Sequence, residues 1–429
     1  MNNDYKCNIL KAQRTGDFIL PNGELEPNTL YTGGRNTNFI AVGSSGSGKT
    51  LGWVMPMIAS GAGGASMVVS DTKGALYERF NEPLEKMGYR VVMLDFTDPA
   101  RSANKYNPIE HLNSTNEVMK TANTIVYLMR NRGEYNRILS ELEVMLLEIA
   151  LGYFLENGRG FERNISGLIG FLNLFDAKAL AEKLPCDISR VMELHKKQYK
   201  EQTGKDSWAF EQYKKFLKMS ENDIKSVLFF AFSDLSSLDT PELREMLSHS
   251  DFDILSLAEE KTAVFINVSD TDRSKDTAIN LFYSQAMDRL CRYADSLPEK
   301  RLPVPVRFIL DDFGTSARIM GFENMISNIR SRGISTMLIL QSIAQLEQGY
   351  GRSASTILSN CSTKAYFGGS DPGTAGYFAE LVGKPVEKLL GMPLLTHWLM
   401  RQGEESASFG RTILMNEYET DSPDNARAS

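Results

Sequence analysis

The chain has 429 residues, of which 42% are hydrophobic and 24% are charged, and its formal net charge is −7. This composition is ordinary for a folded globular protein, and the length favours two domains or one domain with a large insertion. The acidic balance excludes a protein that is basic over its whole surface, so any contact with nucleic acid requires a local basic patch or channel.

The four cysteines and four histidines are scattered along the chain, and no Cys-x-x-Cys pair occurs. This distribution argues against a zinc site or a histidine-based triad, and it predicts reduced thiols in a cytoplasmic protein. We find no signal peptide and no transmembrane segment, because the nearest candidate, residues 138–154, carries three glutamates.

Residues 1–36 are a lead-in to the first predicted strand, Asn38–Val42, which runs directly into a glycine-rich turn. The turn reads Gly-Ser-Ser-Gly-Ser-Gly-Lys-Thr, which is the spacing of a phosphate-binding P-loop. A Gly/Ser linker can match this pattern by chance, but the apolar strand before it and the apolar run after it favour the P-loop. The residues predicted to bind the nucleotide are Gly43, Ser44, Ser45, Gly46, Ser47, Gly48, Lys49 and Thr50.

The glycines let the backbone turn tightly and approach phosphate oxygens, so that successive N–H groups form an anion-binding nest. A helix that begins near Lys49 adds the positive end of its dipole. Lys49 is expected to reach the β- and γ-phosphates, and the hydroxyl of Thr50 is expected to ligate Mg²⁺. The pattern therefore predicts a magnesium–nucleoside triphosphate site.

The chain continues with strands at residues 66–70 and 89–94 and a helix at residues 75–87 between them, an alternation that indicates a parallel sheet covered on both faces. From residue 115 to residue 248 the strand signals vanish and apolar residues recur at helical spacing, which predicts an all-α insertion. Its lysine clusters, at residues 196–197 and 214–215, are more typical of solvated helix faces than of a DNA-binding surface.

Short apolar or β-branched segments then return and predict the remaining strands of the sheet. A tail that is acidic and rich in polar residues, residues 417–429, is expected to be disordered. The predicted strands are residues 262–268, 307–310, 336–340 and 365–367, with a last one at residues 411–415.

Two aspartates follow the apolar segment Phe308–Leu310, as in a Walker B element. Asp311 is expected to hold Mg²⁺, and Asp312 is expected to orient or deprotonate the attacking water. An ordinary acidic turn after a strand is the alternative, but the P-loop upstream favours the catalytic interpretation.

Gln341 stands at the end of the strand predicted next to Asp311 and Asp312, where it can contact the γ-phosphate or the attacking water as a sensor. Arg330 can serve as an arginine finger toward a neighbouring subunit's nucleotide, and Arg332 is the weaker candidate for that role. The alternatives are a polar residue at a strand end and common surface arginines.

Taken together, these motifs resemble the type IV coupling proteins of conjugative transfer systems, the TraG/TraD group. Several motifs in the same order over most of the chain are more specific than any one of them. Among these motifs, Thr72 is a departure from the family pattern, because it replaces the proline of the family's Asp-Pro-Lys-Gly element. The segments that carry the resemblance are residues 36–50, 70–74, 106–108, 250–253, 308–312, 330, 340–342, 366–369 and 374–375.

The resemblance implies a RecA-like α/β P-loop NTPase fold with a mostly parallel central sheet and an inserted all-α domain. The implied nucleotide-binding domain comprises residues 37–114 and 249–416, and the implied insertion comprises residues 115–248. It also implies an ATPase that works as a hexameric ring and moves single-stranded DNA, bound to a relaxase, toward the proteins of a type IV secretion channel. The expected location is the inner face of the cell membrane, reached through a partner protein.

Two further departures from the family pattern occur, one at Asp312 and one before the P-loop. The family usually has Asp-Glu where this chain has Asp311-Asp312, and the shorter side chain is expected to position water less tightly. The family also commonly carries N-terminal transmembrane helices, and no such segment precedes the P-loop here. Either the chain is a soluble member that a membrane partner recruits, or its anchor was removed or lies outside the chain. The Asp312 departure is the one that bears on function. The alternatives are a nucleotide-gated receptor that docks the transfer substrate with little hydrolysis, and a motor for protein substrates only.

Overall fold

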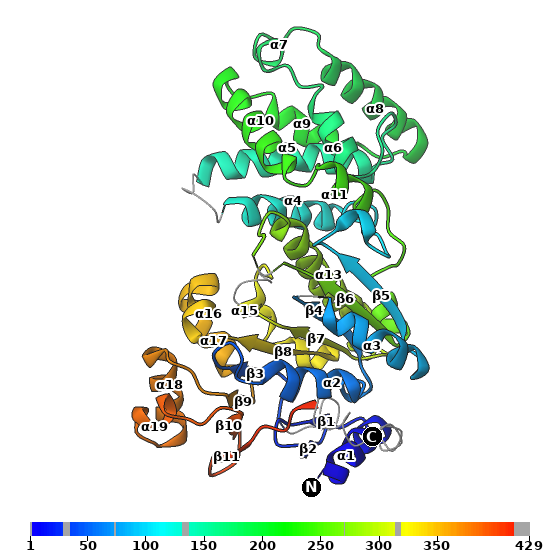
Figure 1. The fold of residues 1–429 in the computed structure, drawn as a ribbon. Helices are drawn as coiled ribbons and strands as arrows, with labels where there is room; N and C mark the ends of the chain where they lie inside the picture. Colours follow the sequence, from blue (N-terminus) through cyan, green and yellow to red (C-terminus); the bar gives the residue numbers. More distant parts are fainter. Residues whose placement is uncertain are drawn as a thin grey trace. The chain divides into compact units, whose positions relative to one another are not determined.

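The structure is a computed structural model that describes residues 2–28, 35–72, 74–130, 137–269, 271–313 and 319–415 (Figure 1). Lys73 and the tail predicted to be disordered lie outside the described residues. The chain divides into two compact units. The first comprises Met1–Thr97, Asp253–Thr271 and Ala286–Ser429, and the second comprises Asp98–Phe252 and Asp272–Gln285.

The first unit contains a sheet of nine strands in the order β11-β10-β9-β3-β8-β7-β4-β6-β5. Every pair from β9 to β5 is parallel, whereas β10 and β11 each run antiparallel to their neighbour. The predicted mostly parallel α/β fold is confirmed. The strands are β3 (Phe39–Val42), β4 (Ser66–Asp71), β5 (Arg90–Asp95), β6 (Thr262–Asn267), β7 (Val306–Leu310), β8 (Ile334–Leu340), β9 (Thr363–Tyr366), β10 (Thr396–Arg401) and β11 (Ser408–Arg411).

One face of this sheet is covered by η1 (Thr50–Val54), α2 (Met55–Ala59) and α3 (Ala75–Lys86). Side chains alternate between the faces of a strand, so every second residue of the central strands points toward these helices. Together with Trp53 and Phe80 they form one buried cluster. The residues of this sheet in it are Phe39, Ala41, Met67, Val69, Met93, Ala263, Phe265, Ile309, Met337, Ile339, Ala365 and Leu399.

The antiparallel edge differs from the prediction at two places. Strand β10 was not predicted, because its sequence, Thr-His-Trp-Leu-Met-Arg, shows neither regular alternation nor a continuous apolar run. The last strand lies at Ser408–Arg411 and not at residues 411–415. The predicted segment leaves the sheet because residues 412–414 instead lie against the helix that follows the P-loop, where Thr412 contacts Gly52.

The described part of the lead-in segment packs against the same core. It forms α1 (Asn2–Thr15) and a hairpin of β1 (Phe18–Ile19) and β2 (Leu25–Glu26). The Phe18 ring meets Phe39 of β3 edge-on at 5.3 Å, and the Trp53 indole N–H donates to the carbonyl of Ile19 at 2.8 Å.

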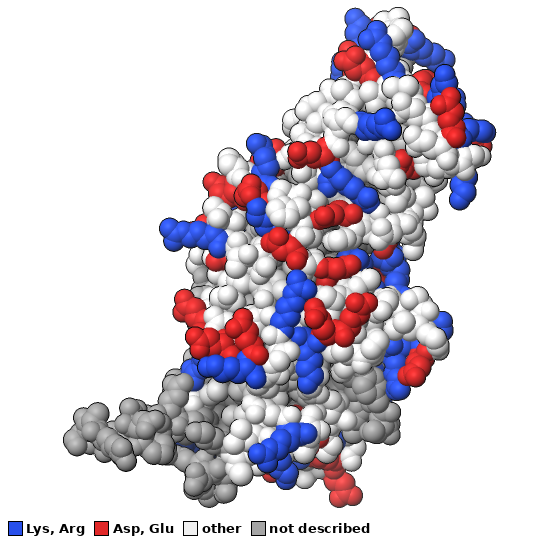
Figure 2. All heavy atoms as spheres, turned by 90° about the vertical axis from the view of Figure 1, so that its right-hand side faces the viewer, with Lys and Arg blue, Asp and Glu red and all other residues white. Residues whose placement is uncertain are grey.

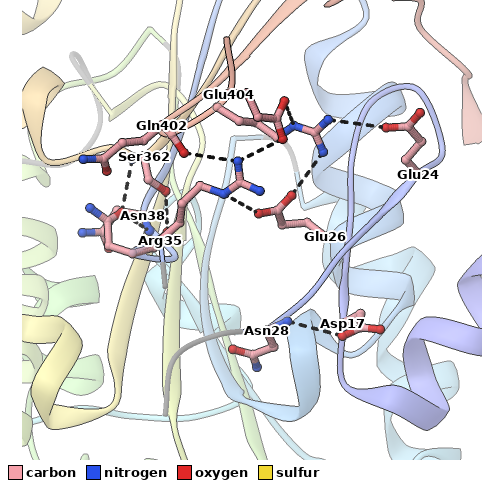
Figure 3. A network of polar contacts seen from close by, with 11 residues as sticks. Asp17, Glu24, Glu26, Asn28, Arg35, Asn38, Ser362, Gln402 and Glu404 are labelled. Carbon is pink, nitrogen blue, oxygen red and sulfur yellow. Dashed lines mark hydrogen bonds and ion pairs between the residues drawn. The ribbon is translucent and has the colours of Figure 1, made fainter. Parts of the chain in front are cut away.

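A network of ion pairs joins this hairpin to the loop after β10 (Figure 3). Glu26, whose side chain is buried, accepts from Arg35 at 3.2 Å and from Arg401 at 3.3 Å. Glu404 pairs with the same two arginines at 3.0 and 2.8 Å, which closes a ring of four charges. Because the ring is partly buried and cyclic, it holds the lead-in segment to the β10 edge more strongly than isolated surface pairs would.

The remaining helices of the first unit follow the strands at their carboxyl ends or lead into them. Among the described residues they are η2 (Ala62–Gly64), α12 (Ser256–Glu259), α15 (Phe322–Met325), η4 (Ile329–Arg332), α16 (Ile343–Tyr350), η5 (Gly351–Ser353), α17 (Ala354–Ser359), α18 (Pro372–Val382) and α19 (Val386–Leu390), while α13 (Asp276–Ser296) has residues in both units.

The second unit is built from helices, and among its described residues from 115 to 248 no strand occurs. In α4, the apolar residues at helical spacing are Val118, Ala122, Ile125, Val126 and Met129. The first four are buried, as amphipathic spacing requires, and the side chain of Met129 lies outside what the structure describes. Its helices are α4 (Thr115–Arg130), α5 (Arg137–Leu155), α6 (Ile165–Leu172), α7 (Ala177–Ala181), α8 (Asp187–Thr203), α9 (Trp208–Phe216), α10 (Glu221–Ser236) and α11 (Pro241–Met246).

A buried carboxylate fixes the packing of this unit. Glu156, which follows α5, accepts from Ser207 at 2.6 Å and from the backbone N–H of Trp208 at 2.6 Å, at the N-terminus of α9. Its Oε2 also lies 2.7 Å from Nε2 of His195 in α8. One side chain therefore joins three helices through hydrogen bonds that are shielded from water.

No helix within the described ranges combines the length and the apolar character that a membrane crossing needs.

Candidate nucleotide-binding site

The P-loop leaves β3 between two neighbouring strands. The N–H of Gly43 donates to the carbonyl of Leu340 at the end of β8 at 3.1 Å, and the N–H of Ser44 donates to Gly368 after β9 at 2.9 Å. A Cβ on Gly43 would stand 2.8 Å from Cβ of Phe367 and 2.9 Å from the carbonyl oxygen of Gly368, so only glycine fits there. The loop is thereby held at the carboxyl edge of the sheet.

The backbone of the loop reverses direction at Gly46 and Gly48, whose φ angles are +75° and +95°. Other residues rarely adopt these angles. The helical turn begins at once, since the N–H of Gly52 donates to the carbonyl of Gly48 at 2.7 Å. The loop therefore presents its N–H groups at a helix N-terminus, which is a favourable place for a phosphate.

Lys49 lies over the loop and is only 7% exposed. Its ammonium donates to the carbonyls of Gly43 at 2.5 Å and Ser44 at 2.9 Å. Burial lowers the pKa of Lys49, while the charges of Asp311 and Asp312 oppose that shift. A lysine ammonium on this loop is the group that the β- and γ-phosphates of a triphosphate require.

Asp311 lies opposite the P-loop threonine. The hydroxyl of Thr50 donates to Oδ2 of Asp311 at 3.0 Å, and the hydroxyl of Ser70 at the end of β4 donates to the backbone carbonyl of Asp311 at 3.2 Å. Burial, and secondarily the charge of Asp312, raises the pKa of Asp311 to about 6, although Thr50 and Lys49 act in the opposite direction. A nearby cation would favour the ionised carboxylate.

Asp312 has an unusual backbone conformation with a φ of +51°. Its N–H donates to Oδ1 of Asp311 at 3.1 Å, and its own Oδ1 accepts from Nε2 of Gln341 at 3.1 Å. Aspartate tolerates the left-handed region better than most residues but still at a cost, and such strain is found preferentially at functional sites. The turn directs the carboxylate of Asp312 toward Gln341, the predicted sensor.

Strand order explains why these groups converge. The strands β3, β8 and β7 are consecutive in the sheet and parallel, so the residues after them, 43–50, 341 and 311–312, meet at one edge. The structure thus brings together the predicted Lys49, Thr50, Asp311, Asp312 and Gln341.

The two arginines lie elsewhere. Arg330 and Arg332 belong to η4, which precedes the amino end of β8, whereas Gln341 follows its carboxyl end. A strand of that length spans about 23 Å, so neither arginine reaches the P-loop of its own chain. Arg332 makes a two-pronged ion pair with Asp295 at 2.8 and 3.0 Å. A finger role for Arg330 remains a prediction that requires a second subunit.

Sequence reasoning missed several supporting residues. Ser70 holds the backbone of Asp311, and Asn38 accepts from the N–H of Thr336 at 3.0 Å, tying the start of β3 to β8. Thr374 accepts from the N–H of Ile343 at 2.9 Å and so fixes the helix that follows Gln341. All three lie within segments that carry the resemblance. The sequence assigns them no role, because their partners come from distant parts of the chain.

One motif of the resemblance has a structural role within the second unit. Asn107 donates to the carbonyls of Arg163 at 2.8 Å and Ser248 at 3.1 Å, and it accepts from the N–H of Ile109 at 2.9 Å. These bonds join the two chain segments, near residues 107 and 248, between which the helices are inserted.

The site fits a magnesium ion that is shared with a phosphate ligand. Groups of three or more His, Cys, Asp or Glu side chains that could hold a metal do not occur in the part of the chain that the structure describes. Thr50 and Asp311, however, already face each other across 3.0 Å with oxygen atoms, and Mg²⁺ takes one or two protein ligands when phosphate and water supply the rest.

A family model described as "Type IV secretory system Conjugative DNA transfer" matches residues 6–388. The chain belongs to this family. Its curated relatives include Protein VirD4 of Rhizobium rhizogenes, 24% identical over 375 residues that make up 84% of this chain and 51% of that protein. Protein VirD4 of Agrobacterium fabrum is 24% identical over 368 residues, 83% of this chain and 51% of that protein. The chain thus spans about half the length of the curated relatives it matches.

Solved structures show the same fold. The unbound bacterial conjugative coupling protein TrwBdeltaN70 superimposes with a TM-score of 0.68 and 17% identity, covering 94% of this chain and 92% of that one. VirB4 of Thermoanaerobacter pseudethanolicus gives a TM-score of 0.56 and 14% identity, covering 96% and 98%. TrwB has also been solved with ADP and Mg²⁺, at a TM-score of 0.67, 16% identity, and coverage of 94% and 92%.

Proposed function

We propose that this chain is the ATPase of a type IV coupling protein and that it uses ATP hydrolysis to move single-stranded DNA toward a type IV secretion channel. The observation that carries the proposal is the contact of Thr50 with Asp311 at 3.0 Å, beside the buried Lys49 and the Gln341–Asp312 pair. These groups are the parts that phosphoryl transfer to water requires, in one place.

Each residue has a role that its position allows. The loop N–H groups and Lys49 bind the triphosphate, and Thr50 and Asp311 hold Mg²⁺. The metal ion, when bound, offsets the negative charge that develops on the phosphate oxygens. Asp312 orients the attacking water and accepts its proton, and Gln341 holds the carboxylate of Asp312 through the 3.1 Å hydrogen bond.

Relatives support ATP and Mg²⁺ as the ligands. TrwB was crystallised with ADP and Mg²⁺ and with a non-hydrolysable ATP analogue, and VirD4 of Bartonella henselae is named a type IV secretion system-coupling protein. We extend these properties to this chain because it belongs to the same family and has the same fold.

In the proposed active state the chain forms a hexameric ring in which Arg330 of each subunit reaches the nucleotide of its neighbour. The ring receives single-stranded DNA with its bound relaxase and delivers it to the secretion channel proteins. A membrane partner holds the ring at the inner face of the cell membrane. Arg330 precedes the amino end of β8, at the opposite end of that strand from Gln341, and this position supports a role between subunits.

DNA contact requires a local surface. On the face shown in Figure 2, lysines and arginines alternate with acidic side chains among the described residues. In the helical unit, Lys196 pairs with Glu193 at 3.4 Å and Lys214 pairs with Glu211 at 2.6 Å, so one lysine of each cluster has an acidic partner. We therefore place the DNA contacts on the channel side of the ring, mainly with phosphates and without sequence preference.

A second function is favoured by the Asp312 turn. A strained aspartate that is one methylene shorter than the family's glutamate suits a nucleotide-gated receptor that binds ATP, docks the relaxase complex and hydrolyses little. A motor that moves only protein substrates is the third possibility.

Steady-state ATPase activity with and without single-stranded DNA separates these functions, with particle size measured in the same samples. The motor requires turnover that DNA stimulates and that Lys49→Ala abolishes. Lys86→Ala is the matched control, because that side chain is 77% exposed on α3. Tight ATP binding with negligible turnover under both conditions identifies the receptor. Stimulation by a purified partner protein and not by DNA identifies the protein motor.

A further inference from the structure

Two glycines of the P-loop helix leave room for the chain segment that follows β11. Gly48 and Gly52 are four residues apart, so they share one face of the helical turn. A Cβ on Gly52 would stand 2.2 Å from Cγ2 of Thr412. A Cβ on Gly48 would stand 3.1 Å from Cδ2 of Leu395 and 3.3 Å from Cδ2 of Leu414.

The two leucines flank the β10–β11 hairpin in the sequence, one before β10 and the other after β11. Leu395 precedes β10 with a φ of +57°, and its carbonyl accepts from the N–H of Thr412 at 2.7 Å. The hydroxyl of Thr412 lies 2.9 Å from Nδ1 of the buried His397, so this contact joins β10 to the segment that follows β11. Leu395 and Leu414 remain partly exposed beside the phosphate-binding loop, although leucine normally favours full burial.

Strand order gives the direction in which a bound nucleotide lies. The groups that serve the γ-phosphate, Asp311, Asp312 and Gln341, follow β7 and β8, which lie on one side of β3. The other side of β3 is occupied by β9, β10 and β11. A nucleotide whose terminal phosphate points toward β7 and β8 therefore directs its base toward the β10–β11 hairpin.

We propose that Leu395 and Leu414 form the surface that receives the base of the nucleotide. Such a surface accepts either purine, which agrees with the structures of the relative TrwB with an ATP analogue and with a GTP analogue. The proposal rests on the proposed function, because it needs a triphosphate in the P-loop. Hydrocarbon side chains hold a flat ring by dispersion and by exclusion of water, and they offer no hydrogen bond to its edge. A larger purine ring therefore gains more than a pyrimidine, whereas the edges that distinguish adenine from guanine are not read.

A different role for these leucines predicts a different result. If they only pack against the P-loop glycines, replacing them disturbs the loop and weakens every ligand that has phosphates. If they receive the base, replacement weakens nucleotides and leaves inorganic triphosphate unaffected. The two roles are separated by comparing ligands with and without a base.

The test measures binding of Mg²⁺ with non-hydrolysable analogues of ATP, GTP and CTP and with inorganic triphosphate, by calorimetry on the full chain. Wild type should bind the two purine analogues within about threefold of each other and both more tightly than triphosphate. Leu414→Asn and Leu395→Asn should each weaken the purine analogues about tenfold, the scale of one lost apolar contact, with triphosphate unchanged. Leu394→Asn is the control, because that neighbouring side chain is 79% exposed.

Several outcomes overturn the proposal. Purine binding that survives both asparagine variants removes the leucines from the base site, and an equal loss for triphosphate shows that they only support the loop. A strong preference of wild type for one purine shows that another group reads the base edge. If the asparagine variants unfold, Leu414→Ala and Leu395→Ala replace them and face the same criteria. A wild-type chain that binds neither triphosphate nor nucleotide defeats the proposed function itself, which is a separate result.

Discussion

The turn at Asp312 allows a test that separates strain from catalysis. We expect Asp312→Gly to leave the stability of the protein unchanged or slightly raised and to make the ATPase inactive. The left-handed backbone at φ +51° costs a non-glycine residue about 1–2 kcal/mol, a penalty that glycine does not have. Glycine also gains about 0.5–1 kcal/mol of freedom in the unfolded chain, which opposes folding.

The lost hydrogen bond from Gln341 is partly exposed and is worth about 0.5 kcal/mol. The net change in the free energy of unfolding therefore lies between a loss of about 0.5 kcal/mol and a gain of about 1 kcal/mol. Activity should behave differently, because removing the group that orients water and accepts its proton should lower the turnover number about 10²- to 10⁴-fold. Stability is therefore kept, or slightly raised, by a change that removes activity.

The assay is urea unfolding of each variant, followed by circular dichroism, alongside ATPase activity at saturating Mg-ATP. Lys300→Gly is the matched control, because Lys300 has a φ of +54°, is exposed and lies outside the site. It should show a similar stability change with full activity. Asp312→Asn keeps the shape and removes the charge, so it should be as stable as wild type and inactive. Clear destabilisation by Asp312→Gly, or activity retained in both variants, would refute the reasoning.

Three further predictions concern the ring, the pH dependence and the helical unit. Arg330→Ala should leave ATP binding by isolated subunits intact and lower hydrolysis by the assembled ring about 10³-fold; an equal loss in monomers would show that Arg330 serves its own chain. Burial lowers the pKa of His397 to about 4, so the folded protein resists a proton that the unfolded chain accepts near pH 6.5. Its contribution is therefore complete above pH 6.5 and is lost as pH falls toward 4, by up to about 3 kcal/mol, and His397→Gln should flatten the pH dependence of urea unfolding over that range. Glu156→Gln should destabilise the helical unit by about 2–4 kcal/mol, because the amide cannot accept all the bonds from Ser207, Trp208 and His195; a variant with an unchanged urea midpoint would show that these bonds contribute nothing net.

Local patterns carried most of what sequence analysis predicted here. Fewer than twenty residues are enough to recognise the P-loop, the apolar strand before Asp311 or the helical periodicity of α4. The parallel sheet follows from the alternation of strands and helices. Each of these signals can be recognised in a single sequence, because it depends on residues that are neighbours along the chain. Strands β10 and β11 lack a signal of this kind, since they lie at an exposed edge with mixed polarity.

What the sequence determined by itself was therefore the identity of the phosphate-binding loop, the two carboxylates and the class of fold. Tertiary structure alone decided that Thr50 meets Asp311, that Ser70 and Thr374 support the site, and that Leu395 and Leu414 converge on Gly48. These contacts join residues that are up to several hundred positions apart. Their existence depends on strand order and on the packing of whole elements, which no local pattern records.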